Sequence, residues 1–344
     1  MSVPDPLPPR KPRRWGLYGP FLLLLVVAAA WSGYWFWLRV QALDQIKAGA
    51  ESLRKAGYEV SWKDDAVGGY PFRLNVALVE PTIREPAGWA LSAPRLEAEA
   101  FLHGLGTWVV AAPQGLTFTR PVGGPVLVGG KLIRASVSHF DNRPPNISFE
   151  GVKLAFTPAA GAQPFGLASA ERVEMHLRAG PDDQAATFFK IEGGKAGVDS
   201  VTSRIAAGKP IAATWDATLS KVSAFKGGDW RTAVRAWTDA GGQASVKEAG
   251  VTAGDVVMGA KSGRLTVGTD GRLRGQLDVT LRGAAQALAA MAAGGVVPPD
   301  AALAAAAVIE ARRGTAASAG ATLTFEAGQT TLGPVAVAPA PQVY

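Results

Sequence analysis

Residue types that often carry out chemistry are few in this chain and widely separated. The sequence contains no cysteine and three histidines, His103, His139 and His176. No histidine has another histidine, an aspartate or a glutamate at the spacing of a metal-binding motif. His176 falls on the polar face of an expected strand, where we expect a solvated side chain. The composition therefore excludes disulfides and thiolate metal sites, and the histidine spacing predicts no metal site.

Nucleophiles and paired carboxylates are equally hard to find. The sequence has no G-x-S-x-G nucleophile elbow. Asp64 and Asp65 are adjacent, so on a strand they would point to opposite faces, and we interpret them as turn residues. The glycines at 104–106 and 123–124 lack the further glycines and the helix of a phosphate-binding loop. We therefore predict no catalytic residue, no cofactor and no enzymatic activity.

The most distinctive local motif is Gly69-Tyr70-Pro71-Phe72-Arg73, which a second glycine precedes. Paired glycines permit a tight reversal of the chain, and proline fixes an extended start for the strand that follows. We interpret the motif as a structural corner, with a binding motif as the alternative.

An uncharged apolar stretch, Leu17 to Leu38, dominates the N-terminal region. At about 1.5 Å per residue a helix of this length spans roughly 33 Å, enough to cross a bilayer core. Arg10, Lys11, Arg13 and Arg14 precede it, and basic residues beside a span stay in the cytoplasm. We predict one transmembrane helix at 17–38 with its N-terminus inside and the bulk of the chain outside.

A cleaved signal peptide is the alternative, because Ala28 to Ala30 supply small residues for a peptidase. The apolar run continues beyond them through an aromatic cluster, Trp31 to Trp37, which suits a membrane interface and favours an uncleaved anchor. We expect residues 1–16, rich in proline, to form a disordered cytoplasmic tail.

Residues 39–57 read as an amphipathic stalk helix, with apolar residues at steps of three and four and Gly57 ending the helix. A dimerisation coil is the alternative. The net charge of the chain is +7; without residues 1–38, which carry four positive charges and one negative charge, it is +4. This charge is too small to predict nucleic-acid binding.

Beyond residue 57 the pattern predicts a mainly β protein. Apolar residues alternate with polar ones along Arg73 to Val79 and along several later stretches, which favours antiparallel strands with one apolar and one polar face. We expect an elongated sheet of two units, 58–160 and 161–344, and a hairpin at Asp270-Gly271.

A few helices should cover this sheet. Asp229 is placed to cap a helix that carries Trp230, Val234 and Trp237 on one face. The alanine-rich stretches 283–293 and 301–313 predict a helical hairpin, with Pro298 and Pro299 before its second helix.

Two segments look like copies of one hairpin unit. Residues 74–78 lead through a loop to 92–97, and residues 152–156 lead through another to 169–174, with matching endings, Arg95-Leu96-Glu97 and Arg172-Val173-Glu174. We interpret them as a duplicated hairpin, with chance similarity of amphipathic strands as the alternative.

The charged N-terminus, the apolar helix, Gly57-Tyr58 and the Gly69 to Arg73 motif resemble the proteins grouped as domain of unknown function 2125 (DUF2125). The closing stretch Leu323 to Pro334 also looks like the final hairpin of that family. The resemblance implies an alphaproteobacterial protein, anchored in the inner membrane and facing the periplasm, and it brings no known activity. A further likeness, by architecture alone, is to AsmA-like envelope proteins, whose repeated hairpins form a trough associated with lipid handling.

These observations lead to two expectations for function. The first is a non-enzymatic envelope protein whose sheet offers an apolar face to lipid or another hydrophobic ligand. The second is a periplasmic scaffold that recruits protein partners through the stalk and the tryptophan-bearing helix.

Overall fold

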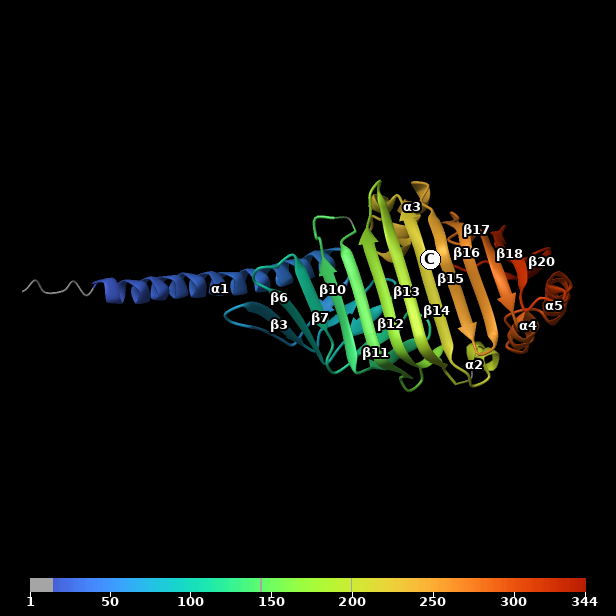
Figure 1. The fold of residues 1–344 in the computed structure, drawn as a ribbon, viewed down its shortest axis with the longest axis horizontal. Coiled ribbons are helices and arrows are strands. Elements are labelled where there is room, and N and C mark those ends of the chain that lie inside the picture. The colour runs from blue at the N-terminus through green and yellow to red at the C-terminus, as the bar shows by residue number, and fades with distance from the viewer. Residues whose placement is uncertain (1–14, 143, 199) are drawn as a thin grey trace, which may run out of the picture.

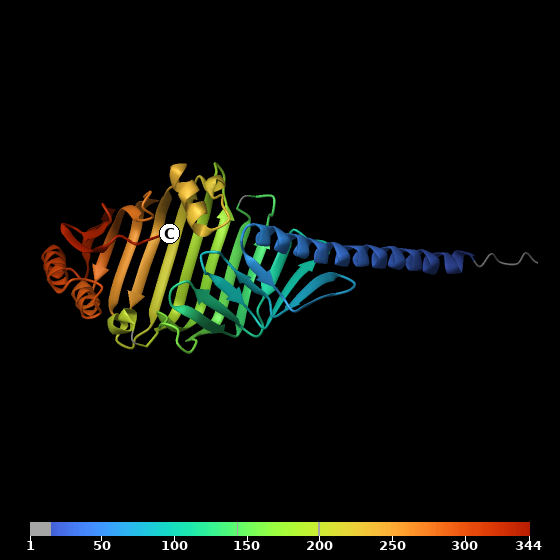
Figure 2. The ribbon, with the colours of Figure 1, turned by 180° about the vertical axis from the view of Figure 1, so that it is seen from behind.

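The computed structural model describes residues 15–142, 144–198 and 200–344, so most of the expected N-terminal tail lies outside the described residues. One long helix, α1 (Trp15–Lys55), opens the fold and is followed by a large antiparallel sheet. The first half of α1 projects beyond the sheet, and the second half lies against it (Figure 1; Figure 2). The expectation of one apolar N-terminal helix followed by a mainly β protein is confirmed.

Helix α1 continues without a break from the apolar stretch into the stalk. It ends at Lys55, and Gly57 adopts a φ of 92°, which favours glycine. Leu38, Leu43 and Ile46 of this helix share a hydrophobic cluster with strands of the sheet. The stalk is therefore packed into the fold.

Within the described ranges, twenty strands form one sheet. The strands of the N-terminal half are β1 (Glu59–Ser61), β2 (Asp64–Gly68), β3 (Arg73–Val79), β4 (Thr82–Arg84), β5 (Ala90–Ser92), β6 (Arg95–Phe101), β7 (Thr107–Ala111), β8 (Leu116–Arg120), β9 (Gly124–Gly129) and β10 (Leu132–Ser138). The remaining strands are β11 (Asn146–Pro158), β12 (Leu167–Ala179), β13 (Gln184–Ala196), β14 (Ile211–Ser220), β15 (Ala244–Ala253), β16 (Val256–Val267), β17 (Leu273–Arg282), β18 (Ala319–Glu326), β19 (Gln329–Leu332) and β20 (Val335–Pro339).

From β11 to β20 each strand pairs with the next in a simple antiparallel order. On its other side β11 pairs with two strands: residues 146–152 pair with β10, and residues 155–158 pair with β9. The sheet divides there into a first branch, β10-β7-β6-β3-β2, and a second branch, β9-β8-β5-β4-β1. The later half of α1 packs against residues of both branches.

At three of the places where the chain passes from one branch to the other, its backbone adopts a left-handed conformation. Glu80, between β3 and β4, and Lys153, inside β11, both have a φ near 50°. Gly115, between β7 and β8, has a φ of 81°, and a Cβ there would lie 2.6 Å from the carbonyl oxygen of Val128. The left-handed conformations at these positions let the backbone turn from the strand direction of one branch to that of the other.

Short helices lie at the edges and at the far end of the sheet. They are α2 (Val201–Ala206), the 3₁₀ turn η1 (Val222–Ala224), α3 (Trp230–Asp239), α4 (Ala284–Ala293) and α5 (Pro299–Arg313). Asp229 caps α3 through a hydrogen bond from the Thr232 amide to its carboxylate, at 2.8 Å. Helices α4 and α5 pack against each other as the expected hairpin.

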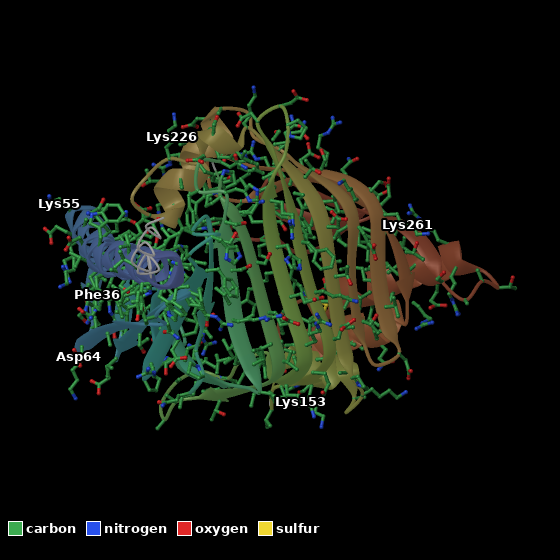
Figure 3. All side chains as sticks on the ribbon, turned by 60° about the vertical axis from the view of Figure 1, so that its left-hand side comes forward. Phe36, Lys55, Asp64, Lys153, Lys226 and Lys261 are labelled. Carbon is green, nitrogen blue, oxygen red and sulfur yellow. The ribbon has the colours of Figure 1, made fainter. Side chains whose placement is uncertain are left out.

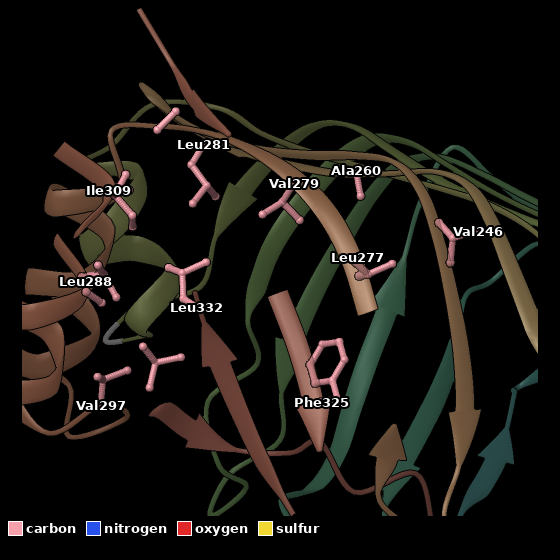
Figure 4. Close-up of a cluster of buried hydrophobic side chains, with 14 of the residues drawn as sticks. Val246, Ala260, Leu277, Val279, Leu281, Leu288, Val297, Ile309, Phe325 and Leu332 are labelled. Carbon is pink, nitrogen blue, oxygen red and sulfur yellow. The ribbon is translucent and has the colours of Figure 1, made fainter. Parts of the chain in front are cut away.

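The largest hydrophobic core lies between α4, α5 and the last strands. Leu281 of β17 lies beside Ile309 of α5, and Val279 and Leu277 follow it along the strand, away from Leu288 of α4 and Ile309 (Figure 4). Leu332 of β19 and Phe325 of β18 complete this end of the core (Figure 4). The two helices thus close the distal end of the sheet.

One local prediction is wrong and another is confirmed. Asp64 and Asp65 are not turn residues: they begin β2 and pair with Val79 and Leu78. The strand tolerates both carboxylates, because Asp64 is exposed on an edge strand of the first branch and Asp65 accepts a hydrogen bond from the indole nitrogen of Trp62, at 3.0 Å. The Asp270-Gly271 hairpin is confirmed, between β16 and β17.

The two hairpins of the suggested duplication both form antiparallel pairs, β3 with β6 and β11 with β12. Their registers differ, however. In the first hairpin, Leu78 pairs with Leu96. In the second hairpin, Val173, which is the equivalent of Leu96, pairs with Gly151, five residues from the position that a copied register would give. The duplication and the division near residue 160, which falls between the paired strands β11 and β12, stay predictions.

Candidate functional site

A continuous row of apolar residues crosses the inner face of the sheet, the face on which α1, α3, α4 and α5 lie. Each member pairs directly with the next on the neighbouring strand. From β2 through the first branch to β18, the row comprises Val67, Val76, Ala98, Val110, Ala135, Phe149, Met175, Phe189, Trp215, Ala249, Ala260, Val279 and Ala321. With neighbouring strands about 4.8 Å apart, the row extends for roughly 55 Å.

The outer face is polar over the same strands. Glu150 accepts hydrogen bonds from Arg134, at 2.7 Å, and from Arg172, at 2.8 Å, and Arg172 also pairs with Glu174. The hydrogen bond from Arg134, together with both positive charges, lowers the pKa of Glu150 below its ordinary value. The sheet is therefore two-sided, as the alternation predicts.

Different elements cover different parts of the apolar row. At the α1 end, Val67 and Val76 are buried beside Leu38. At the distal end, Val279 is buried beneath the α4–α5 hairpin. Met175, in the middle of the row, is 49% exposed. The inner face is sealed at both ends and open between them.

The opening is a cavity of ≈ 980 Å³. Its floor is made by β11 to β14, with Phe149, Met175 and Phe189 of the apolar row. Its other walls come from the β10–β11 loop and from η1 to α3, through side chains such as Phe225 and Trp230. This volume lies at the upper end of the range for sites that hold small molecules.

Trp215 connects this cavity with two smaller neighbours of ≈ 260 and ≈ 240 Å³, because its side chain lines all three. Its indole nitrogen donates a hydrogen bond to Thr187 Oγ1, at 3.1 Å, and that hydroxyl donates to the carbonyl oxygen of Ala217. The polar groups of Trp215 and Thr187 are thus satisfied within the protein, which leaves their part of the floor apolar towards a ligand.

Lys226 is the one charged side chain among the described residues that line the cavity. It is exposed beside α3 and forms no ion pair with any residue in the described ranges (Figure 3). Ser223, a neighbouring polar residue that also lines the cavity, donates to Asp183 at 2.9 Å. The rim therefore offers one positive charge next to an apolar interior.

The segment from η1 to α3 is held over the cavity at both sides. The amide of Trp230 donates to Glu85 of the β4–β5 turn, at 2.8 Å, and its indole nitrogen donates to the carbonyl oxygen of Val343, also at 2.8 Å. Trp237 is buried and stacks on Phe225. The segment is a strap between the second branch and the C-terminal residues.

The Gly69 to Arg73 motif lies away from the cavity, at the tip of the β2–β3 hairpin. Gly69 has a φ of 99°, and a Cβ there would lie 2.7 Å from the carbonyl oxygen of Arg73. The peptide bond between Tyr70 and Pro71 is cis. The tip contacts the apolar part of α1, and Phe36 of α1 and Asp64 of β2 lie at the same end of the molecule (Figure 3).

The three histidines occupy separate settings. His103 packs against Phe101, and His139 lies 3.1 Å from Ser138 Oγ. His176 is on the polar face but is not the solvated side chain expected from the sequence, because its ring stacks on Phe188 and its Nδ1 is sheltered without a hydrogen-bond partner. Across the described residues no group of three His, Cys, Asp or Glu side chains is placed to hold a metal ion.

Fold and site together define a class of protein: one long apolar helix joined to a two-sided antiparallel sheet whose inner face is open in the middle. The sequence matches the family described as "Uncharacterized protein conserved in bacteria (DUF2125)" over residues 35–341. The chain belongs to this family, as its motifs indicated. Comparison with curated proteins and comparison with solved structures each give no match.

Proposed function

We propose that the protein is a non-enzymatic, membrane-anchored bacterial protein that binds the hydrocarbon chain of a lipid on the inner face of its sheet. In this proposal α1 spans the inner membrane, with its N-terminus in the cytoplasm, and the sheet lies in the periplasm. The helix is long and apolar enough to cross a membrane, which supports the anchor.

The observation that carries the proposal is the ≈ 980 Å³ cavity in the middle of the apolar row. It lies between the part of the row that α1 covers and the part that α4 and α5 cover. At the two ends of the row, protein side chains bury Val67, Val76 and Val279. In the cavity between them, Met175 is left 49% exposed. A flexible apolar chain would bury this surface, and burial stabilises by about 25 cal/mol per Å² of apolar area.

The surfaces suggested for a protein partner are less available than the sequence indicated. Leu43 and Ile46 of the stalk pack on the sheet, and Trp237 of α3 is buried. Partner recruitment stays a prediction, and the lipid-retention experiment does not depend on it.

Lipid retention by the full-length protein tests the proposal. The protein is extracted from bacterial membranes in mild detergent, and lipid that stays bound through gel filtration is quantified by mass spectrometry. Met175→Glu places a charge in the cavity, and Val198→Glu places one at a site that is 78% exposed and does not line the cavity.

We expect the wild type and Val198→Glu to retain the same amount of lipid and Met175→Glu to retain less. Lipid that surrounds α1 is common to all three proteins, so it cancels in the comparison. Equal retention by the three proteins would refute the proposal.

A further inference from the structure

The tip of the β2–β3 hairpin lies along the apolar part of α1. The indole nitrogen of Trp31 donates a hydrogen bond to the carbonyl oxygen of Pro71, at 2.8 Å, and Ser32 Oγ lies 2.9 Å from the hydroxyl of Tyr70. Trp31 stands seven residues before Leu38, so the tip reaches about 10 Å inward from the end of the apolar stretch.

The tip and the helix beside it expose a group of aromatic rings. Tyr70 is 54% exposed and Phe72 is 67% exposed. Their rings pack on those of Phe36 and Trp31, with centroids 6.5 Å apart in both pairs. Exposed aromatic rings that combine an apolar body with a polar edge are typical of the boundary between lipid and water.

Four of the five carbonyl groups of the tip accept hydrogen bonds within the protein. Gly69 accepts from the amide of Arg73, Phe72 accepts from the amide of Leu102, and Arg73 accepts from the indole nitrogen of Trp35. With Pro71 bonded to Trp31, these carbonyl oxygens all have donors, although the side chains around them are exposed. Such satisfaction is required in lipid, where an unpaired backbone group costs several kcal/mol, and is not required in water.

The tip carries one charged side chain, Arg73, and this charge is compensated. Its guanidinium pairs with Glu99, at 2.8 Å, and lies 4.9 Å from the ring centroid of Phe101. Both partners lie on β6: Phe101 is directly opposite Arg73, and Glu99 is two residues further from the tip. The charge is thus directed away from the exposed rings of Tyr70 and Phe72.

We propose that the β2–β3 tip, residues Gly69 to Arg73, inserts into the outer lipid interface of the membrane that α1 crosses. It forms a second contact with the bilayer, beside the helix, and fixes the sheet's orientation on the membrane surface. This inference rests on the part of the proposed function in which α1 spans the membrane, and it does not depend on the ligand cavity.

The absence of native cysteine allows a direct test with single labels on the full-length protein. Phe72→Cys reports on the tip, Leu24→Cys reports on α1, and Val122→Cys, on the β8–β9 turn, serves as the control. All three positions are well exposed, at 67%, 70% and 77%, so a label disturbs little packing. Each variant carries a polarity-sensitive dye and is reconstituted into phosphatidylethanolamine–phosphatidylglycerol vesicles, with and without a phospholipid that bears a quencher.

We expect the dye at position 72 to show blue-shifted emission and strong quenching by the lipid-borne quencher, as at position 24, while the dye at position 122 shows neither. If position 24 is quenched and position 72 is not, the tip stays in water and this inference is wrong, while the anchor stands. If position 24 is not quenched, the anchor itself fails. A dye at position 72 that is blue-shifted but not quenched by lipid would indicate a protein contact and would also overturn the inference.

Discussion

Trp35 of α1 donates a hydrogen bond from its indole nitrogen to the carbonyl oxygen of Arg73 on β3, at 2.9 Å, and its side chain is 3% exposed. In the sequence this residue belongs to the apolar stretch, but in the structure its side chain is buried against the sheet. It joins the anchor to the first branch, so the helix and the sheet form one folded body.

Removal of this hydrogen bond should weaken the joint. We expect Trp35→Phe to lower the free energy of unfolding by about 1–2 kcal/mol, because the Arg73 carbonyl oxygen loses its donor in a buried place. Trp37→Phe is the matched control, since Trp37 is 55% exposed on the same helix. Chemical denaturation in detergent, followed by circular dichroism, measures both variants, and equal midpoints would contradict this role for Trp35.

Closure of the distal end depends on one face of α5. Ile309 is 2% exposed, whereas Leu303 on the same helix is 74% exposed. We expect Ile309→Ala to destabilise the protein by about 2–4 kcal/mol, through lost burial and the cavity left behind, and Leu303→Ala to have little effect. Thermal and urea unfolding compare them, and a large effect at Leu303 would show that α5 packs through a different face.

The ion pairs of Glu150 should make stability depend on pH in the acid range. The pKa of Glu150 is lowered in the folded protein, chiefly by its hydrogen bond from Arg134, so its contribution is present above the ordinary value near 4.5 and is lost as the pH falls through the lowered pKa. We expect Glu150→Gln to cost about 1 kcal/mol or less at neutral pH, because the pair is partly exposed.

The difference between wild type and Glu150→Gln should shrink as the pH falls below about 4.5. Denaturant midpoints at a series of pH values measure it. Glu171→Gln is the control: Glu171 lies on the neighbouring strand β12 and has no described ion pair, so this variant should show no such change. A difference that stays constant with pH would mean that the charge of Glu150 is not the cause.

Lys226 should influence which lipids are retained. It is the described cation at the rim of the cavity, so we expect Lys226→Glu to reduce retention of anionic lipids more than retention of neutral ones. Lys226→Gln separates loss of the positive charge from repulsion by a negative one. Mass spectrometry of the retained lipids measures the ratio, and an unchanged ratio would place the headgroup away from Lys226.

Sequence patterns predicted the elements with strong local signals. The bounds of β3, the Asp229 cap of α3, the α4–α5 hairpin and the end of α1 before Gly57 all follow from alternation, capping chemistry or glycine. Alternation gives the face of each residue but not the partner of each strand. The division of the sheet into two branches was therefore not predictable.

The floor of the cavity was missed for a related reason. In β13, Phe188 and Phe189 are adjacent and fall on opposite faces, which hides the alternation. In β14 and β15, inner positions such as Ala213, Ala217 and Ala249 are small, so their contrast with polar neighbours is weak. Trp215 was the available signal, as a large apolar residue among small ones.

Photocrosslinking with a lipid that carries a diazirine in its acyl chain tests directly whether the cavity binds a hydrocarbon chain. The full-length protein is reconstituted with this lipid, irradiated and digested, and the modified peptides are mapped by mass spectrometry. We expect modification within β11 to β14 and the segment from η1 to α3, around Met175, Phe189 and Trp230, in addition to modification of α1. Modification confined to α1 and the β2–β3 tip would contradict this expectation.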